Sequence, residues 1–165
     1  MLKMNRTFTV VAISLGFLAF LPRVQAADRY TVSANGQEVK DNKTQLIWRR
    51  CPEGMTWSGD TCAGSASAMT HQAALQQAAS QAADTGVAWR LPNVKELASI
   101  VDRSRSNPAI DTSAFPATPS NAFWSSSPSV GSASRYAWVV SFGDGGVGSY
   151  GRNVSLPVRL VRASQ

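Results

Sequence analysis

Histidine and cysteine are scarce in this sequence, which has one His and two Cys among its 165 residues. Zinc and similar metal sites draw most of their ligands from these residue types, so His71, Cys51 and Cys62 are too few to build such a site. A serine nucleophile would need His71 as its base, and no Gly-x-Ser-x-Gly motif is present. We therefore predict no metal centre, no cofactor and no catalytic residue, and we expect His71 to be solvated at the start of a helix.

Clustered carboxylates are also missing. Asp102, Asp111 and Asp144 are the residues that a calcium site or a glycosidase pair would use, but their spacing matches no calcium loop. Aspartate is common in turns and caps for local reasons, and Asp144 stands directly before two glycines. We expect these three side chains to have structural roles.

Long hydrophobic runs are absent except for one at the N-terminus. Lys3 and Arg6 precede the apolar run from Thr7 to Leu21, and Val24-Gln25-Ala26 is typical of a cleavage site. The run is shorter than the ~20 residues that a membrane span needs. We predict a secretory signal peptide at 1–26 and one domain at 27–165. The alternative is an uncleaved anchor; with cleavage, no stable transmembrane segment remains, and the protein is periplasmic or at the cell surface.

The charge is mildly basic. Removal of residues 1–26 would leave 13 basic and 10 acidic residues, so the formal net charge would fall from +6 to +3. A charge of this size does not require a nucleic-acid partner, and we predict none. Ten of the remaining basic residues are Arg. Arginine suits two-pronged contacts with carboxylate, sulfate or phosphate groups, and it is equally common in structural ion pairs.

Cys51 and Cys62 are expected to form one disulfide, because exported proteins mature where disulfides persist and the cysteine count is even. A metal pair and a redox pair are the alternatives, although the spacing is not Cys-x-x-Cys. Closing a loop of this size stabilises a fold by about 3 kcal/mol or less. The enclosed loop contains Trp57 and two glycines, and we expect Trp57 to pack inward.

A first helix is predicted from about residue 71 to residue 83. Thr70 can cap its N-terminus, its alanines have high helix propensity, and Gly86 is a natural stop. The expected inward face consists of Leu75, Ala78, Ala79 and Ala82.

A second helix follows the extended segment Arg90-Leu91-Pro92, because proline keeps the residue before it out of the helical region. Asn93 is the expected N-cap, and Glu96 three positions later completes a capping box. The apolar stripe comprises Val94, Leu97, Ala98 and Val101. We expect this helix to end near 103–105.

The rest of the sequence predicts short strands and irregular loops. Residues 104–121 form a long loop that Ile110 and Phe115 should anchor. Strands do not alternate with helices, so an α+β fold is favoured over α/β. The β-prone segments are 30–33, 45–48, 123–126, 136–142, 147–150 and 158–162.

The order of these segments resembles the Lcl C-terminal domain family. The similarity covers nearly the whole predicted domain, from about Val39 onward. The resemblance implies a variant of the C-type-lectin fold, with two helices, short antiparallel strands and long irregular loops. It also implies an exported bacterial protein, and for the namesake it implies adhesion through sulfated glycosaminoglycans. The matching pieces are Asp41 to Trp48, Trp89 to Pro92, Glu96-Leu97, Pro108 to Asp111, Phe115-Pro116, Phe123 to Ser126, Ala137 to Phe142 and Val158 to Arg162.

The sequence departs from related patterns in three ways. The collagen-like repeat of the namesake is missing, so the avidity of a trimeric stalk is not expected. The Glu-Pro-Asn, Gln-Pro-Asp and Trp-Asn-Asp triplets of calcium-dependent lectins are missing, so a calcium-mediated sugar site is not expected. Formylglycine-generating enzymes share the broad fold and use a reactive cysteine pair, whereas Cys51 and Cys62 are expected to pair with each other.

Arginines in the second half are the main candidates for binding. If the late loops converge on one face, these residues, here called the late arginines, would form a basic patch for sulfate or carboxylate groups; the alternative is scattered solvated charges. Trp57 and Tyr150 are further candidates, whereas the other tryptophans should pack in the core. Arg159 and Arg162 are expected to form ion pairs with the scaffold. The late arginines are Arg103, Arg105, Arg135 and Arg152.

The sequence therefore favours an exported, non-enzymatic, adhesin-like module that binds glycosaminoglycans, other acidic glycans or sulfated polyanions through its late loops. The alternative is an interaction or assembly factor of the envelope or of an appendage, which would bind an envelope protein or a second copy of itself. An enzyme is the third hypothesis.

Overall fold

The computed structural model describes residues 28–129 and 135–164, and the predicted signal peptide at 1–26 lies outside them. No helix in the described part of the chain is long and apolar enough to span a membrane. The elements, in chain order, are β1 (Tyr30–Val32), β2 (Glu38–Asp41), β3 (Leu46–Arg49), β4 (Thr56–Trp57), β5 (Cys62–Ala63), α1 (His71–Thr85), α2 (Val94–Ser99), β6 (Ala122–Pro128), β7 (Tyr136–Ser141), β8 (Val147–Gly151) and β9 (Val161–Ala163).

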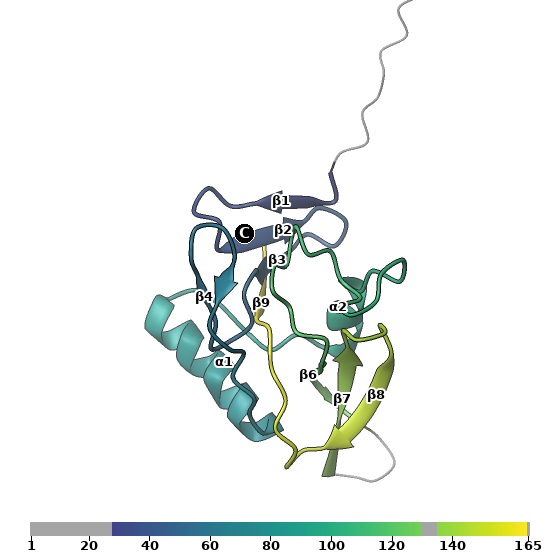
Figure 1. The fold of residues 1–165 in the computed structure, drawn as a ribbon. Coiled ribbons are helices and arrows are strands. Elements are labelled where there is room, and N and C mark those ends of the chain that lie inside the picture. The colour runs from purple at the N-terminus through teal and green to yellow at the C-terminus, as the bar shows by residue number, and fades with distance from the viewer. Residues whose placement is uncertain (1–27, 130–134, 165) are drawn as a thin grey trace, which may run out of the picture.

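Most strands belong to two antiparallel sheets, with the strand orders β1-β2-β3-β9 and β6-β7-β8 (Figure 1). Strands β4 and β5 pair only with each other. In the first sheet, Val39 pairs with Trp48, and Trp48 pairs with Val161 on its other side. The predicted α+β class is confirmed, and the two helices with short antiparallel sheets are consistent with a C-type-lectin-like fold.

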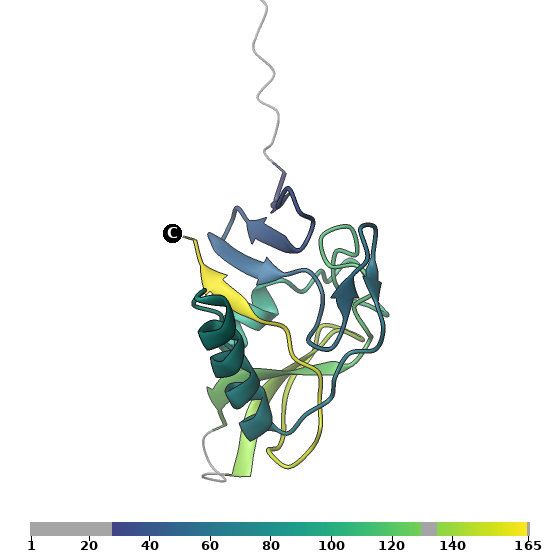
Figure 2. The same cartoon turned by 90° about the vertical axis from the view of Figure 1, so that its left-hand side faces the viewer.

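The buried side chains form two cores. The first contains Trp48, Leu97 and Phe115, and so joins the first sheet, α2 and the long loop. The second contains Trp89 and Trp124 and lies where α1 packs against β6 (Figure 2). The predicted loop anchors, Ile110 and Phe115, are fully buried, so this prediction is confirmed. Among the other tryptophans, Trp138 is only half-buried.

Helix α1 has its predicted caps but a different inward face. Thr70 accepts a hydrogen bond from the N–H of Ala73, and Gly86 adopts the left-handed conformation that ends the helix. The buried residues are His71, Ala74 and Ala78, whereas Leu75 is 42 % exposed. Of the four residues predicted to face inward, only Ala78 is buried, whereas Leu75 and Ala79 are exposed, so most of the predicted face was wrong. Alanine occurs all around this helix, so packing against β6, rather than a strong apolar stripe, determines its orientation.

The predictions that α2 extends to 103–105 and that His71 is solvated were also wrong. The capping box of Asn93 and Glu96 is present, but the helix ends at Ser99. The Asp102 carboxylate accepts from the N–H and hydroxyl of Ser104 and from Arg105, and such local bonds compete with helical ones. His71 is buried, with its Nε2 2.9 Å from the carbonyl oxygen of Ser125 and its ring edge against Trp124.

Arg159 was predicted to pair with a carboxylate, and this prediction was wrong. Its fully buried guanidinium donates to the carbonyl oxygens of Arg49 and Arg50 and to the hydroxyl of Thr118, and it lies 4.9 Å from the Phe115 ring centre. Burial, and secondarily the charge of Arg50, lower the pKa of Arg159 to about 9. This side chain therefore ties the long loop to the end of β3.

The last strand is shorter than predicted. Residues 158–160 precede β9 and bond elsewhere: the carbonyl oxygen of Val158 accepts from Glu53, and that of Leu160 accepts from Arg49. These two bonds place the backbone of Glu53 and Arg49 beside the same segment. Arg162 does form its predicted ion pair, with Glu38 at 2.7 Å.

Candidate functional site

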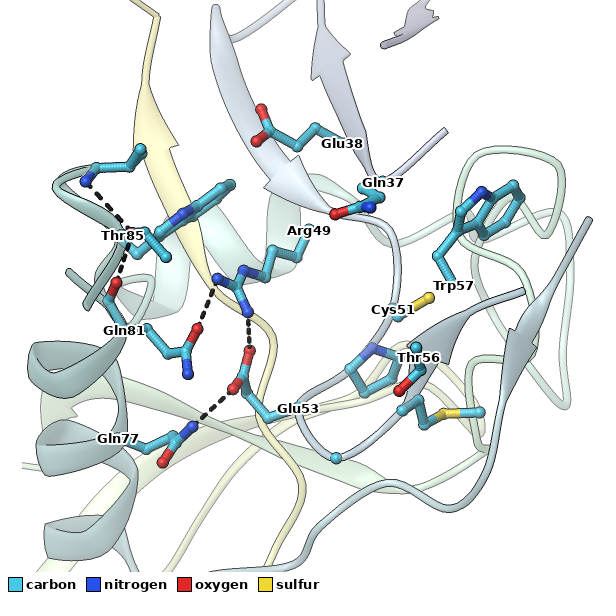
Figure 3. Close-up of a pocket in the computed structure, with 15 residues that line it drawn as sticks. Gln37, Glu38, Arg49, Cys51, Glu53, Thr56, Trp57, Gln77, Gln81 and Thr85 are labelled. Atoms are coloured by element: carbon cyan, nitrogen blue, oxygen red, sulfur yellow. Dashed lines mark hydrogen bonds and ion pairs between the residues drawn. The ribbon is translucent and has the colours of Figure 1, made fainter. Parts of the chain in front are cut away.

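A polar cleft of about 520 Å³ lies between α1, the ends of β2 and β3, and the disulfide loop (Figure 3). Its volume is within the range of ~300–1,000 Å³ that small-molecule sites occupy. We call it the α1 cleft. Its walls consist of Gln37 and Glu38, Arg49, residues 51–57, and Gln77, Gln81, Thr85, Val87 and Trp89.

The disulfide loop forms one wall of the cleft. Cys51 and Cys62 are bonded, with an S–S distance of 2.03 Å, so this prediction is confirmed. The loop contains the short β4–β5 pair, in which Trp57 is paired with Cys62. Trp57 also lies against Gly36, where an added Cβ would come within 2.7 Å of the indole ring, so only glycine fits there.

Glu53 and Arg49 are the charged centre of the cleft. The Glu53 carboxylate is almost fully buried and accepts from Arg49 at 3.1 Å and from Gln77 at 2.9 Å. The other arm of the Arg49 guanidinium donates to Gln81 at 2.7 Å. The four side chains form a continuous network between the first sheet and α1 (Figure 3). Such a network is rigid because each ionic group is held by more than one partner.

Two arginines hold Trp89 at the edge of the cleft. The strand register puts Glu38 opposite Arg49 and Ile47 opposite Arg162, so both arginines project from one face of the first sheet. Their guanidinium carbons lie 5.0 Å and 5.4 Å from the Trp89 ring centre, within cation–π distance. The indole is therefore packed by charged groups and serves as a wall of the cleft.

The glutamines come from one face of α1. Gln77, Gln81 and Thr85 are spaced four residues apart, which places them one above the other along the helix. This spacing is visible in the sequence, but a polar stripe is common on any solvated helix and does not by itself indicate a site. What distinguishes this stripe is that Gln77 and Gln81 are bonded to Glu53 and Arg49 across the cleft, and these contacts follow only from the fold.

The Lcl C-terminal domain model matches residues 37–162, which is most of the chain. The chain belongs to the Lcl C-terminal domain family. Every residue that lines the α1 cleft lies within the matched region. No curated protein shows significant similarity to the chain.

In this Lcl C-terminal domain the late arginines lie at two ends of β7. Arg135 directly precedes β7, and its carbonyl oxygen accepts from the N–H of Arg152 at 2.8 Å. Arg103 and Arg105 follow α2 in the segment that bonds to Phe142, just beyond the other end of β7. The structure therefore separates them into two pairs at the two ends of β7, which agrees with the alternative of scattered charges. A ligand-binding role for either pair stays a prediction.

The remaining predicted site residues also lie apart. Tyr150 is exposed on β8 opposite Ala137, near Arg135 and Arg152. Of the predicted ligand-binding residues, only Trp57 lines the α1 cleft. Arg105 pairs with Asp102 at 3.0 Å, and Arg152 donates from Nε to the carbonyl oxygen of Tyr136. Sequence reasoning therefore identified one residue of the cleft and missed Arg49, Glu53, Gln77 and Gln81.

A second hollow of about 540 Å³ lies at the start of α1, where Thr70, His71, Leu75 and Arg152 contribute to its wall. Burial lowers the pKa of His71, and the charge of Arg152 acts in the same direction, whereas the hydrogen bond to Ser125 raises it. Within residues 28–129 and 135–164, no three His, Cys, Asp or Glu side chains are grouped so that they could hold a metal ion.

Proposed function

We propose that this protein is an exported, non-enzymatic binding module and that the α1 cleft holds a glycan. The observation that carries the proposal is the network of Gln77, Glu53, Arg49 and Gln81 beside Trp89 and Trp57 in one cleft of suitable volume. Small-molecule sites combine apolar walls with a few well-placed polar groups. Trp57, which is half-buried, supplies an apolar surface, Trp89 supports the wall from beneath its arginines, and the amides and ions supply hydrogen bonds.

Preorganisation supports binding as the role of this network. A ligand that bonds to side chains already held in place does not have to order them, so more of the contact energy contributes to affinity. Gln77 and Gln81 are long side chains that would otherwise be mobile on a helix surface. Glu53 and Arg49 hold them in position.

The proposed export rests on the apolar N-terminal run and on the Cys51–Cys62 disulfide, since disulfides persist in oxidising compartments such as the periplasm and the cell exterior. Non-enzymatic binding is supported by the engagement of both oxygens of Glu53 with Arg49 and Gln77. The single histidine of the sequence, His71, packs on Trp124 rather than lining this cleft.

A glycan array with the purified protein tests the proposal, with a Gln77→Ala/Gln81→Ala variant and a Gln76→Ala control. Gln76 is exposed on the same helix and does not line the cleft. We expect signal on a restricted set of glycans for the wild type and the control, and loss of that signal in the double variant. An empty array, or equal signal from all three proteins, would contradict the proposal.

A second candidate function is protein interaction within the envelope or an appendage. Tyr136, Val147 and Tyr150 are exposed apolar residues on β7 and β8, and β8 is at the edge of its sheet. Exposed apolar groups on an edge strand are suited to a protein partner or to a second copy of the chain. Specific capture of an envelope protein by the wild type, lost on Tyr150→Ser and Val147→Ser, would favour this candidate.

A further inference from the structure

The charges around the α1 cleft are already neutralised by protein partners. Among the described residues that line it, the charged ones are Glu38, Arg49 and Glu53, which is one positive group against two negative groups. Arg49 is paired with Glu53 at 3.1 Å, and Glu38 is paired with Arg162 at 2.7 Å. An added sulfate or carboxylate would therefore approach two carboxylates while competing with Glu53 for Arg49. With Arg162 counted beside Glu38, two positive groups balance two negative groups, so the cleft has no surplus positive charge to attract an anionic ligand.

The orientation of both glutamine amides follows from their partners. A carboxylate can only accept, so the group of Gln77 that faces Glu53 must be its NH₂. A guanidinium can only donate, so the group of Gln81 that faces Arg49 must be its carbonyl oxygen. This leaves the acceptor oxygen of Gln77 and the donor NH₂ of Gln81 for a ligand. The two residues are one helical turn apart, which places their side chains roughly 6 Å from each other.

An acceptor beside a donor matches hydroxyl groups. A hydroxyl both donates and accepts, so two neighbouring hydroxyls of a sugar ring can satisfy Gln77 and Gln81 together. A sulfate has only acceptors and would leave the Gln77 oxygen facing another oxygen. An ammonium group has only donors and would leave the Gln81 NH₂ without a partner.

We infer that the α1 cleft selects an uncharged saccharide and that Gln77 and Gln81 are the residues that determine this selection. The inference rests on the proposed function, since it names the chemical class of the glycan in the same cleft. The inferred ligand class differs from the sulfated glycosaminoglycans that the family resemblance implied. Arg49 and Glu53 are positioning residues here, because they fix which end of each amide the ligand meets.

The test is calorimetric titration of the purified protein with neutral tetrasaccharides of glucose, mannose, galactose and N-acetylglucosamine, and with heparin and chondroitin sulfate tetrasaccharides. We expect at least one neutral tetrasaccharide to bind, with an affinity that does not fall when the NaCl concentration is raised about tenfold, because no net charge is neutralised. Gln77→Ala and Gln81→Ala should each weaken that binding about tenfold, which is the loss of roughly one hydrogen bond.

The Gln76→Ala control should bind as the wild type does, and alanine keeps the helix intact at all three positions. Binding of a sulfated tetrasaccharide that Gln77→Ala abolishes would overturn the inference but leave the α1 cleft as a glycan site. Neutral binding unchanged in both cleft variants would show that Gln77 and Gln81 do not select the ligand. If none of the tetrasaccharides binds, the inference and the proposed function both fail.

Discussion

Two groups of arginines in this molecule differ in what surrounds them. The guanidiniums of Arg49, Arg50, Arg159 and Arg162, here called the scaffold arginines, contact carbonyl oxygens, carboxylates or aromatic rings in the first sheet and its loops. Of the late arginines, Arg103, Arg105 and Arg135 are exposed. Residue type therefore did not reveal function. Whether an arginine is structural or exposed depends on the hydrogen-bond and ion-pair partners that the fold places around its guanidinium.

The largest effect that would test this comparison is expected for Arg159→Ala. Three oxygens, on Arg49, Arg50 and Thr118, would lose their donor, and each buried unsatisfied group costs roughly 1–3 kcal/mol. Removal of a buried charge offsets part of this. We expect a loss of about 4 kcal/mol in the free energy of unfolding, measured by urea denaturation. Arg103→Ala, as the matched control, should change it by less than about 0.5 kcal/mol. Equal losses of stability in the two variants would contradict the distinction between scaffold arginines and late arginines.

The next largest effect is expected when the disulfide is removed by Cys51→Ser/Cys62→Ser. The closed loop is short, so the loss of stability should be about 3 kcal/mol or less. Because Cys51 and Trp57 line the α1 cleft, ligand binding should weaken as well. The check is thermal unfolding together with the titration described above. A variant that binds as tightly as the wild type would show that the bridge does not shape this wall.

A smaller effect is expected from pH through His71, which is buried like Arg50 and Arg159 of the scaffold group. Burial lowers its pKa in the folded state below the usual value of 6.5, so the unfolded chain binds more protons in the interval between the two. Stability should therefore fall as pH drops below about 6.5 and should stop falling, as far as His71 is concerned, below the folded pKa. Urea midpoints of wild type and His71→Gln, compared across this pH range, check the prediction. Parallel pH profiles would contradict it.

The smallest effect is expected from reversing the charge of the late arginines to glutamate, two at a time. Stability should change by less than about 0.5 kcal/mol for Arg103/Arg105 and for Arg135/Arg152, since these side chains are surface groups. Neutral saccharide binding in the α1 cleft should be unchanged. Retention on heparin, eluted with a salt gradient, shows whether either pair attracts polyanions. A loss of saccharide binding in these variants would place the site at β7 and not beside α1.

The features that the sequence predicted well are local. The Asn93 capping box and the Gly86 stop depend on residues within a few positions of one another. The disulfide could be predicted because the sequence contains only two cysteines. The buried face of α1 was predicted wrongly because alanines occur on all sides of this helix. Small differences in packing against β6 therefore decide which side is buried.

The α1 cleft could not have been predicted in the same way. Glu53 meets Gln77 only because Val158 and Leu160 fix the backbone beyond β3, and because the disulfide closes the loop. The division of the late arginines follows from the position of β7 between them, which no spacing in the sequence records. Interactions between distant segments therefore account for most of what was missed.

The pairing of β9 with β3 has a kinetic consequence. Trp48 reaches its final surroundings only when Val161 lies beside it, and the two residues are far apart along the chain. Contacts of such large sequence separation form slowly, because much chain entropy is lost before they contribute. A chain that crosses a membrane in the order of its sequence would thus present β1, β2 and β3 without their last neighbour until residues 161–163 have emerged. During such a crossing the first sheet would stay incomplete until Val161 has emerged, so Trp48 could reach its native pairing only after that point.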